Sequence, residues 1–206
     1  MLRLGTVDPM NRPPESGPVV LYSDFNCPFC YAMHERLHAH GVSDRIEWRG
    51  VQHAPHLPVP MARWNGDLME ELRHEVEMVG RLAPGLPIAL PEGKPNTRPA
   101  IQLAARALAA DASRGAALID RLYRLFWCEG EDISDATVLA DAVLALGLRQ
   151  DQLAGNEGQI EGKLQNWNDH WHRTGQAGVP LLERTDGMLL VGLAREGDLR
   201  RFLSLS

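Results

Sequence analysis

The stretch VVLYSDFNCPFCYAMHERLHAHG, residues 19–41, decides how this chain folds. Its first part is an apolar and aromatic run that stops before a proline, which is typical of a buried β-strand. From Cys30 the pattern becomes helical, because Pro28 suits a first helical turn and Gly41 suits a helix end. The stretch therefore predicts a strand that leads straight into a helix, with Cys27 and Cys30 at the junction.

Composition and charge exclude several classes of protein. The chain has 206 residues, 44% hydrophobic and 23% charged, as expected for one globular domain, with or without an insertion. Its net charge of −6 counts against a general binder of nucleic acid or anionic membranes. No apolar run is long enough to cross a bilayer, and residues 1–17 lack the apolar core of a signal peptide and predict a flexible lead-in. We expect a cytoplasmic protein with no nucleic-acid or membrane partner, and its oligomeric state stays open.

The remaining pattern adds one strand, a helical middle and a C-terminal hairpin. RIEWRGV, residues 45–51, predicts a second strand, which in a β-α-β unit lies parallel to the first. Apolar residues at helical spacing predict helices, with Ser134 as the N-cap of the third, at 98–112, 116–127, 134–147 and, more weakly, 156–172. Two short strands, 180–184 and 188–192, flank an Asp-Gly turn, and a closing helix covers 196–205.

This order of elements, β-α-β, helices, then β-β-α, indicates an α/β fold. Without the central helices it has the plan of a thioredoxin fold, a small mixed sheet with helices packed on it. We therefore expect a thioredoxin-like domain made of residues 17–61 and 161–206, interrupted by an all-helical insertion over residues 62–160.

Two of the three cysteines form a C-x-x-C motif, which in a cytoplasmic protein is more often redox-active or metal-binding than structural. Cys27 is expected at the helix N-terminus, where unpaired backbone N–H groups and the helix dipole favour its thiolate. Cys30, one turn further, is expected to be less exposed and to resolve the mixed disulfide that Cys27 forms. Pro28 and Phe29, which lie between them, help to set the redox potential. Cys128 stands alone and is predicted to be a small buried residue.

Four segments together resemble a known family. They are DFNCPFCY at 24–31, NTRPAIQLAARAL at 96–108, GEDISDATVLADAVLALGL at 130–148 and GVP at 178–180. This combination resembles the DsbA-like thiol–disulfide oxidoreductases. It is most similar to their cytoplasmic branch, shared with FrnE-like proteins and related to 2-hydroxychromene-2-carboxylate isomerases. The likeness covers residues 17–204. It implies exchange with protein or small-molecule disulfides and no cofactor, with glutathione as a candidate co-substrate.

The resemblance also implies part of the site. The Val179–Pro180 bond is expected to be cis, although only about 5–6% of X-Pro bonds are cis in folded proteins. Pro180 would face the catalytic pair Cys27 and Cys30, and the backbone of Val179 would pair with an extended substrate. Pro28, Phe29 and His53 complete the predicted substrate-binding set.

One position departs from the family pattern. Many thioredoxin-fold oxidoreductases have a buried carboxylate six residues before the first cysteine, and this chain has Leu21 there. The nearest acid is Asp24, which either handles a proton or only caps the turn or helix start. If the first two strands are parallel, Gln52 and His53 emerge near Cys27, and a protonated His53 would favour its thiolate. The alternative for His53 is a loop histidine that only makes a local hydrogen bond.

Other histidines raise the question of a metal site. Cys30, His34 and His38 follow one another at intervals of four residues along one helix face. A zinc site needs about four ligands in tetrahedral reach, and three residues spread over two turns of one helix cannot converge on one ion. We therefore expect solvated histidines and no metal site.

Two further functions stay open beside the dithiol oxidoreductase. A glutathione-dependent isomerase or transferase of the related class would have a serine where Cys27 stands, so two cysteines count against it. A non-enzyme would use Cys27 and Cys30 as metal ligands or keep the fold to bind a partner. The oxidoreductase is the favoured hypothesis.

Overall fold

The computed structural model describes residues 17–63, 66–149, 153 and 157–205, so the predicted lead-in at the N-terminus lies outside the described residues. The strands in these residues are β1 (Val19–Ser23), β2 (Ile46–Gly50), β3 (Leu181–Arg184) and β4 (Leu189–Val191). The helices are α1 (Pro28–Ala39), the short 3₁₀ turn η2 (Ser43–Arg45), α2 (Asp67–Leu82), α3 (Arg98–Ala110), α4 (Ala112–Trp127), α5 (Ala136–Ala145), α7 (Glu157–Arg173) and α8 (Glu196–Phe202). The predicted thioredoxin-like α/β fold with central helices is confirmed.

The sheet has the strand order β2-β1-β3-β4. Strand β1 pairs parallel with β2 and antiparallel with β3, and β3 and β4 form the predicted hairpin. Ser23 is in register with Gly50, so the chain leaves β1 and β2 at the same edge of the sheet. The loops that follow these two strands are therefore neighbours, and the backbone N–H of Val51 donates to the carbonyl of Ser23 at 2.9 Å.

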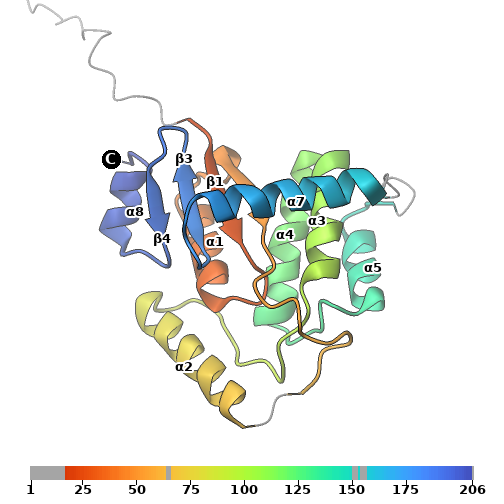
Figure 1. Ribbon diagram of the computed structural model, residues 1–206. Helices are drawn as coiled ribbons and strands as arrows, with labels where there is room; N and C mark the ends of the chain where they lie inside the picture. The colour runs from red at the N-terminus through yellow and green to blue at the C-terminus, as the bar shows by residue number, and fades with distance from the viewer. Residues whose placement is uncertain (1–16, 64–65, 150–152, 154–156, 206) are drawn as a thin grey trace, which may run out of the picture.

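Helices cover both faces of the sheet, because successive side chains of a strand point to opposite sides. Leu21 belongs to the main core cluster, together with α1, α3 and α4, whereas Tyr22 packs in a smaller cluster with Trp171 of α7. Figure 1 shows α3, α4 and α5 gathered on one side of the sheet, α7 running along the molecule, and α2 standing apart below α1.

Helix α4 is tied to the junction between β1 and α1. The indole of Trp127 donates to the carbonyl of Phe25 at 2.8 Å, and the hydroxyls of Tyr123 and Ser23 are 2.5 Å apart. Tyr123, Phe126 and Trp127 are all buried, as expected for core aromatic residues at helical spacing. These contacts hold the junction that contains the two cysteines.

Three features differ from the sequence predictions. Asp135, not Ser134, caps α5, and its carboxylate accepts the backbone N–H of Thr137 at 2.7 Å, while the Ser134 hydroxyl donates to Asp132. Two adjacent cap-forming residues made the choice ambiguous at the level of sequence. Cys128 is exposed rather than buried, because α4 ends at Trp127 and the chain then turns to the surface. The sequence also did not delimit α2.

The boundaries drawn for the helical insertion remain a prediction. The helices between β2 and β3 lie where the insertion was expected, but α7 runs without a break across residue 160. In the described part of the chain, no helix is both long enough and apolar enough to cross a membrane.

Candidate active site around Cys27 and Cys30

Cys27 is the N-cap of α1, and Pro28 takes the first helical position. The carbonyl of Cys27 accepts the backbone N–H groups of Cys30 and Tyr31 at 3.1 and 3.2 Å, which starts the helix. Proline at the next position removes no helical hydrogen bond, because the first N–H groups of a helix have no partner in it. The side chain of Cys27 is thus fixed at the positive end of the helix dipole, as predicted.

The two sulfurs have different surroundings. Cys27 keeps 7% of its surface exposed, whereas Cys30 is completely buried. The backbone N–H of Asp24 lies 3.5 Å from the Sγ of Cys30. Burial raises the pKa of the Cys30 thiol well above its ordinary value, and the neighbouring Cys27 raises it further. Of the two thiols, Cys27 is the one that an external disulfide can reach, while Cys30 holds its proton behind it.

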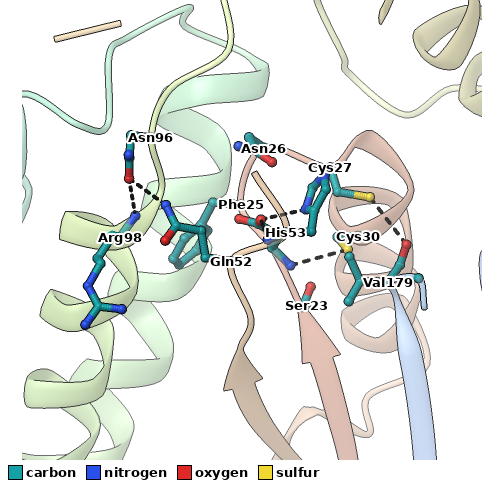
Figure 2. A network of polar contacts seen from close by, with 12 residues as sticks. Ser23, Phe25, Asn26, Cys27, Cys30, Gln52, His53, Asn96, Arg98 and Val179 are labelled. Carbon is teal, nitrogen blue, oxygen red and sulfur yellow. Dashed lines mark hydrogen bonds and ion pairs between the residues drawn. The ribbon is translucent and has the colours of Figure 1, made fainter. Parts of the chain in front are cut away.

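The loop before β3 faces Cys27. The Val179–Pro180 peptide bond is cis, as the family resemblance implied, and Pro180 leads directly into β3. The Sγ of Cys27 is 3.6 Å from the carbonyl oxygen of Val179, an approach that Figure 2 shows from close by. Val179 is partly exposed beside Cys27.

Asp24 holds His53 and does not cap the helix. Its carboxylate is fully buried, and Oδ2 accepts both the backbone N–H of His53 at 3.0 Å and the Nδ1 of His53 at 2.7 Å. Its other oxygen has no hydrogen-bond partner among the described residues. When Asp24 is ionised it only accepts, so Nδ1 carries the proton and Nε2 is left to take one.

The sequence placed His53 correctly at this edge of the sheet. It left open whether His53 acts on Cys27 or makes a local hydrogen bond, and the structure shows the hydrogen bond to Asp24. The side chain of His53 is 32% exposed, and Figure 2 shows it directed to the same end of the site as Cys27. The carboxylate that orients His53 belongs to Asp24, three residues before Cys27. Many thioredoxin-fold oxidoreductases instead have a carboxylate six residues before the first cysteine, where this chain has Leu21.

A second polar group borders the site. Gln52 donates to the side-chain oxygen of Asn96 at 2.6 Å, and the backbone N–H of Arg98 donates to the same oxygen at 3.1 Å. Asn26 donates to the carbonyl of Pro95 at 2.9 Å. Figure 2 shows the contacts of Asn96 with Gln52 and Arg98, which join the loop after β2 to the start of α3. The contact of Asn26 joins the loop after β1 to the segment that precedes α3. No local pattern predicts a role for Asn96 or Arg98, which lie about seventy residues from the cysteines in a segment that carries the family resemblance.

Four other predicted positions have mixed outcomes. Pro28 is buried, and Phe29 is partly exposed and packs on the core, so of these two only Phe29 offers surface to a substrate. The expectation of solvated histidines on α1 is wrong for His34, which is buried and lies 2.7 Å from Asp120 of α4. His38 is exposed and lies 3.0 Å from the same oxygen. The sequence missed Asp120 because nothing local connects it with α1.

Comparison with known proteins gives one family and one fold. Residues 18–204 match the family model of the DSBA-like thioredoxin domain. Comparison with curated proteins found no match. Among solved structures, the cytosolic disulfide reductase DsbM of Pseudomonas aeruginosa is 22% identical, with a TM-score of 0.69 over 91% of this chain and 97% of DsbM. DsbM has also been solved with GSH.

Two more solved structures share the fold. A 2-hydroxychromene-2-carboxylate isomerase is 18% identical, with a TM-score of 0.66 over 90% of this chain and 94% of the isomerase. The thiol–disulfide exchange protein α-DsbA2 of Wolbachia pipientis is 14% identical, with a TM-score of 0.57 over 94% and 83% of the two chains. At these identities the likeness is one of fold, and a disulfide reductase, a thiol–disulfide exchange protein and an isomerase share it.

Proposed function

Since this chain belongs to the DSBA-like thioredoxin domain family, we propose that it exchanges thiols and disulfides through a redox couple formed by Cys27 and Cys30. The observation that carries the proposal is the asymmetry of the two sulfurs. Cys27 lies at the N-terminus of α1 and opposite Val179, and Cys30 is buried one turn behind it. An attacking thiol needs access and a favoured thiolate, and a resolving thiol needs to stay protonated until the attack is over.

The exchange balances as two steps. The thiolate of Cys27 attacks one sulfur of a substrate disulfide, forms a mixed disulfide with that half and releases the other half as a thiolate. Cys30 then loses its proton and attacks the Sγ of Cys27, which releases the second half and closes the Cys27–Cys30 disulfide. The substrate gains two electrons and the protein loses two. The same steps in reverse oxidise a substrate dithiol.

The proton of Cys30 needs an acceptor, because burial raises the pKa of this thiol. We assign that role to the pair of Asp24 and His53. The backbone N–H of Asp24 contacts the Cys30 sulfur, and its carboxylate orients His53 so that Nε2 is free to accept a proton, directly or through water. The partly exposed ring of His53 can then pass the proton to solvent.

The substrate is held by backbone rather than by a deep pocket. The carbonyl and N–H of Val179, before the cis bond to Pro180, suit an extended peptide or a peptide-like thiol, and Phe29 offers apolar contact beside Cys27. The GSH complex of DsbM supports glutathione as a co-substrate here. We propose no other cofactor. A disulfide-bearing protein or small thiol in the cytoplasm is the proposed partner.

The test is a redox titration in glutathione buffers, with acid quench, alkylation and intact mass. A reversible two-proton mass change should be confined to Cys27 and Cys30. In turnover assays Cys27→Ser should abolish exchange, Cys30→Ser should accumulate mixed disulfide, and His53→Gln should slow resolution by roughly 10-fold or more. Cys128→Ser is the matched control, because this thiol is exposed but lies outside the site.

Turnover that survives in Cys27→Ser would sink the proposal. If the pair never closes and Cys27 instead holds glutathione, the isomerase or transferase hypothesis replaces it. If both sulfurs hold a metal in the purified protein, the non-enzyme hypothesis replaces it.

A further inference from the structure

We propose that His34 and His38 of α1, together with Asp120 of α4, form a binding site for one divalent transition-metal ion of the Zn²⁺ class. The site is separate from the dithiol, because none of the three ligands is a cysteine. It goes beyond the proposed function and does not depend on it.

The three ligand atoms already converge. The Nε2 of His34 is 2.7 Å from the Oδ1 of Asp120, and the Nε2 of His38 is 3.0 Å from the same oxygen. All three atoms lie within 4.8 Å of one another. Ligands that surround Zn²⁺ at about 2.0–2.2 Å are themselves separated by distances of this order. Small movements of side chains would therefore complete the ligand set.

The spacing on α1 is that of a helical metal-binding pair. Residues 34–38 read HERLH, so the two histidines stand at i and i+4 on one face, as in helices that bind zinc through H-E-x-x-H. In hydrolytic enzymes the glutamate of that motif acts as a base. Here Glu35 lies 3.5 Å from the Arg124 guanidinium of α4 and is not one of the converging groups. We therefore assign metal binding and no hydrolytic activity.

The surroundings hold the ligands in place. The ring of His34 packs against Tyr123, with ring centroids 4.8 Å apart, and Tyr123 is itself held by Ser23. Contacts such as these position metal ligands without touching the ion. Their loss commonly changes the affinity for the metal by about 10–100-fold.

The site has both an entrance and room for a further ligand. The side chains of His38 and Asp120 are 38% and 35% exposed, so an ion can enter from solvent. The same three residues, together with Leu21 and Trp48, border a cavity of about 80 Å³. A water molecule takes about 30 Å³ in the liquid, so the cavity has room for a water as fourth ligand.

The test measures metal binding without the cysteines, which would bind Zn²⁺ themselves. Zn²⁺ is titrated into Cys27→Ser/Cys30→Ser/Cys128→Ser protein against a chromophoric chelator, and Co²⁺ is used to record the visible spectrum of the bound ion. We expect one equivalent per chain. His38→Ala and Asp120→Asn in the same background should weaken binding by more than about 100-fold. His172→Ala, which removes an exposed histidine of α7, should leave binding unchanged.

The folding of each variant is checked by circular dichroism and by the midpoint of thermal unfolding without metal. His38 is exposed, so His38→Ala is expected to fold normally even if Asp120→Asn does not. Zn²⁺ should raise the midpoint of the cysteine-free protein and should not raise that of His38→Ala. Less than one equivalent, or equal affinity in His38→Ala, would show that the three residues are only an ion-paired cluster.

Discussion

At the scale of single residues, Cys27 and Cys30 show how a difference in burial gives two identical side chains different chemical roles. Both belong to the same turn of α1, yet one lies at its open end and the other faces the core. Removing a thiolate from water costs free energy, so the buried thiol keeps its proton. The division of labour in the proposed exchange follows from this difference.

This difference predicts a pH dependence of stability. An ordinary thiol has a pKa near 9.0, and burial raises the pKa of Cys30 well above that value. Below pH 9 both the folded and unfolded chains keep this proton, and the contribution of Cys30 is complete. As the pH rises from about 9 towards the folded pKa, only the unfolded chain loses the proton, so the free energy of unfolding falls. The unfolding constant should rise by up to tenfold per pH unit.

The measurement is urea unfolding of the reduced protein between pH 7.5 and 10.5, with Cys30→Ser as the control. Buried tyrosines contribute at higher pH, for example Tyr22 with a pKa of about 12, and the charge of Cys30 also raises the pKa of the buried Tyr123. The difference between the two curves therefore reports the ionisation of Cys30 together with its effect on Tyr123. Parallel curves would contradict the buried, protonated thiol.

At the scale of elements, the joint between α3 and α4 sets the position of the helix that supports the site. Asp111 is at once the C-cap of α3 and the N-cap of α4, and its carboxylate accepts the N–H of Arg114. One residue makes the turn, so the two helices must approach closely. A Cβ on Gly115 would lie 2.5 Å from the backbone nitrogen of Leu108, which no side-chain movement can relieve.

Gly115→Ala should therefore destabilise the protein although alanine favours helices. Overpacking costs typically about 1–3 kcal/mol, and the backbone contact places this variant at the upper end. Gly162→Ala in α7 is the matched control, because a Cβ there meets nothing within 4 Å. It should be neutral or stabilising by up to about 1 kcal/mol. The midpoints of urea unfolding of the two variants test this prediction. A Gly115→Ala protein as stable as the unchanged protein would show that α3 and α4 can move apart.

At the scale of the whole molecule, the helices are not equally anchored. Helices α3 and α4 contribute fully buried residues to the main core, whereas α2 packs chiefly against α1 through a narrow apolar face with Leu72 and Val79. Figure 1 shows α2 apart from the sheet, and Leu68 and Leu82 on it are exposed. The guanidinium of Arg36 in α1 donates to the carbonyl of Leu82, which holds the C-terminal end of α2 to α1.

We expect α2 to open independently of the core. A helix held by one face has little buried area to lose, so its local opening free energy lies below the global value. Amide hydrogen exchange followed by mass spectrometry should show α2 exchanging well before α4. Arg36→Ala should increase the difference in exchange rate between α2 and α4, because it releases the end of α2. Equal protection of α2 and α4 would mean that the whole chain opens as one unit.

The sequence by itself determined the local features. The β-α-β start, the C-terminal hairpin, most helices, and the place of Cys27 and Cys30 at the junction were all predicted correctly, because each depends on residues a few positions apart. Hydrophobic period, proline and glycine positions, and cap residues act over that range. The choice between Ser134 and Asp135 failed because both residues satisfy the same local rule.

Only the tertiary structure decided which distant side chains meet. His53 is 29 residues from Asp24, and Asp120 is 86 residues from His34, and no pattern in either segment names its partner. Parallel pairing of β1 with β2 brings the first pair together, and packing of α4 on α1 brings the second. Burial likewise depends on what the rest of the chain covers, which is why Cys30 and His34 are buried while Cys128, in an apolar run, is exposed.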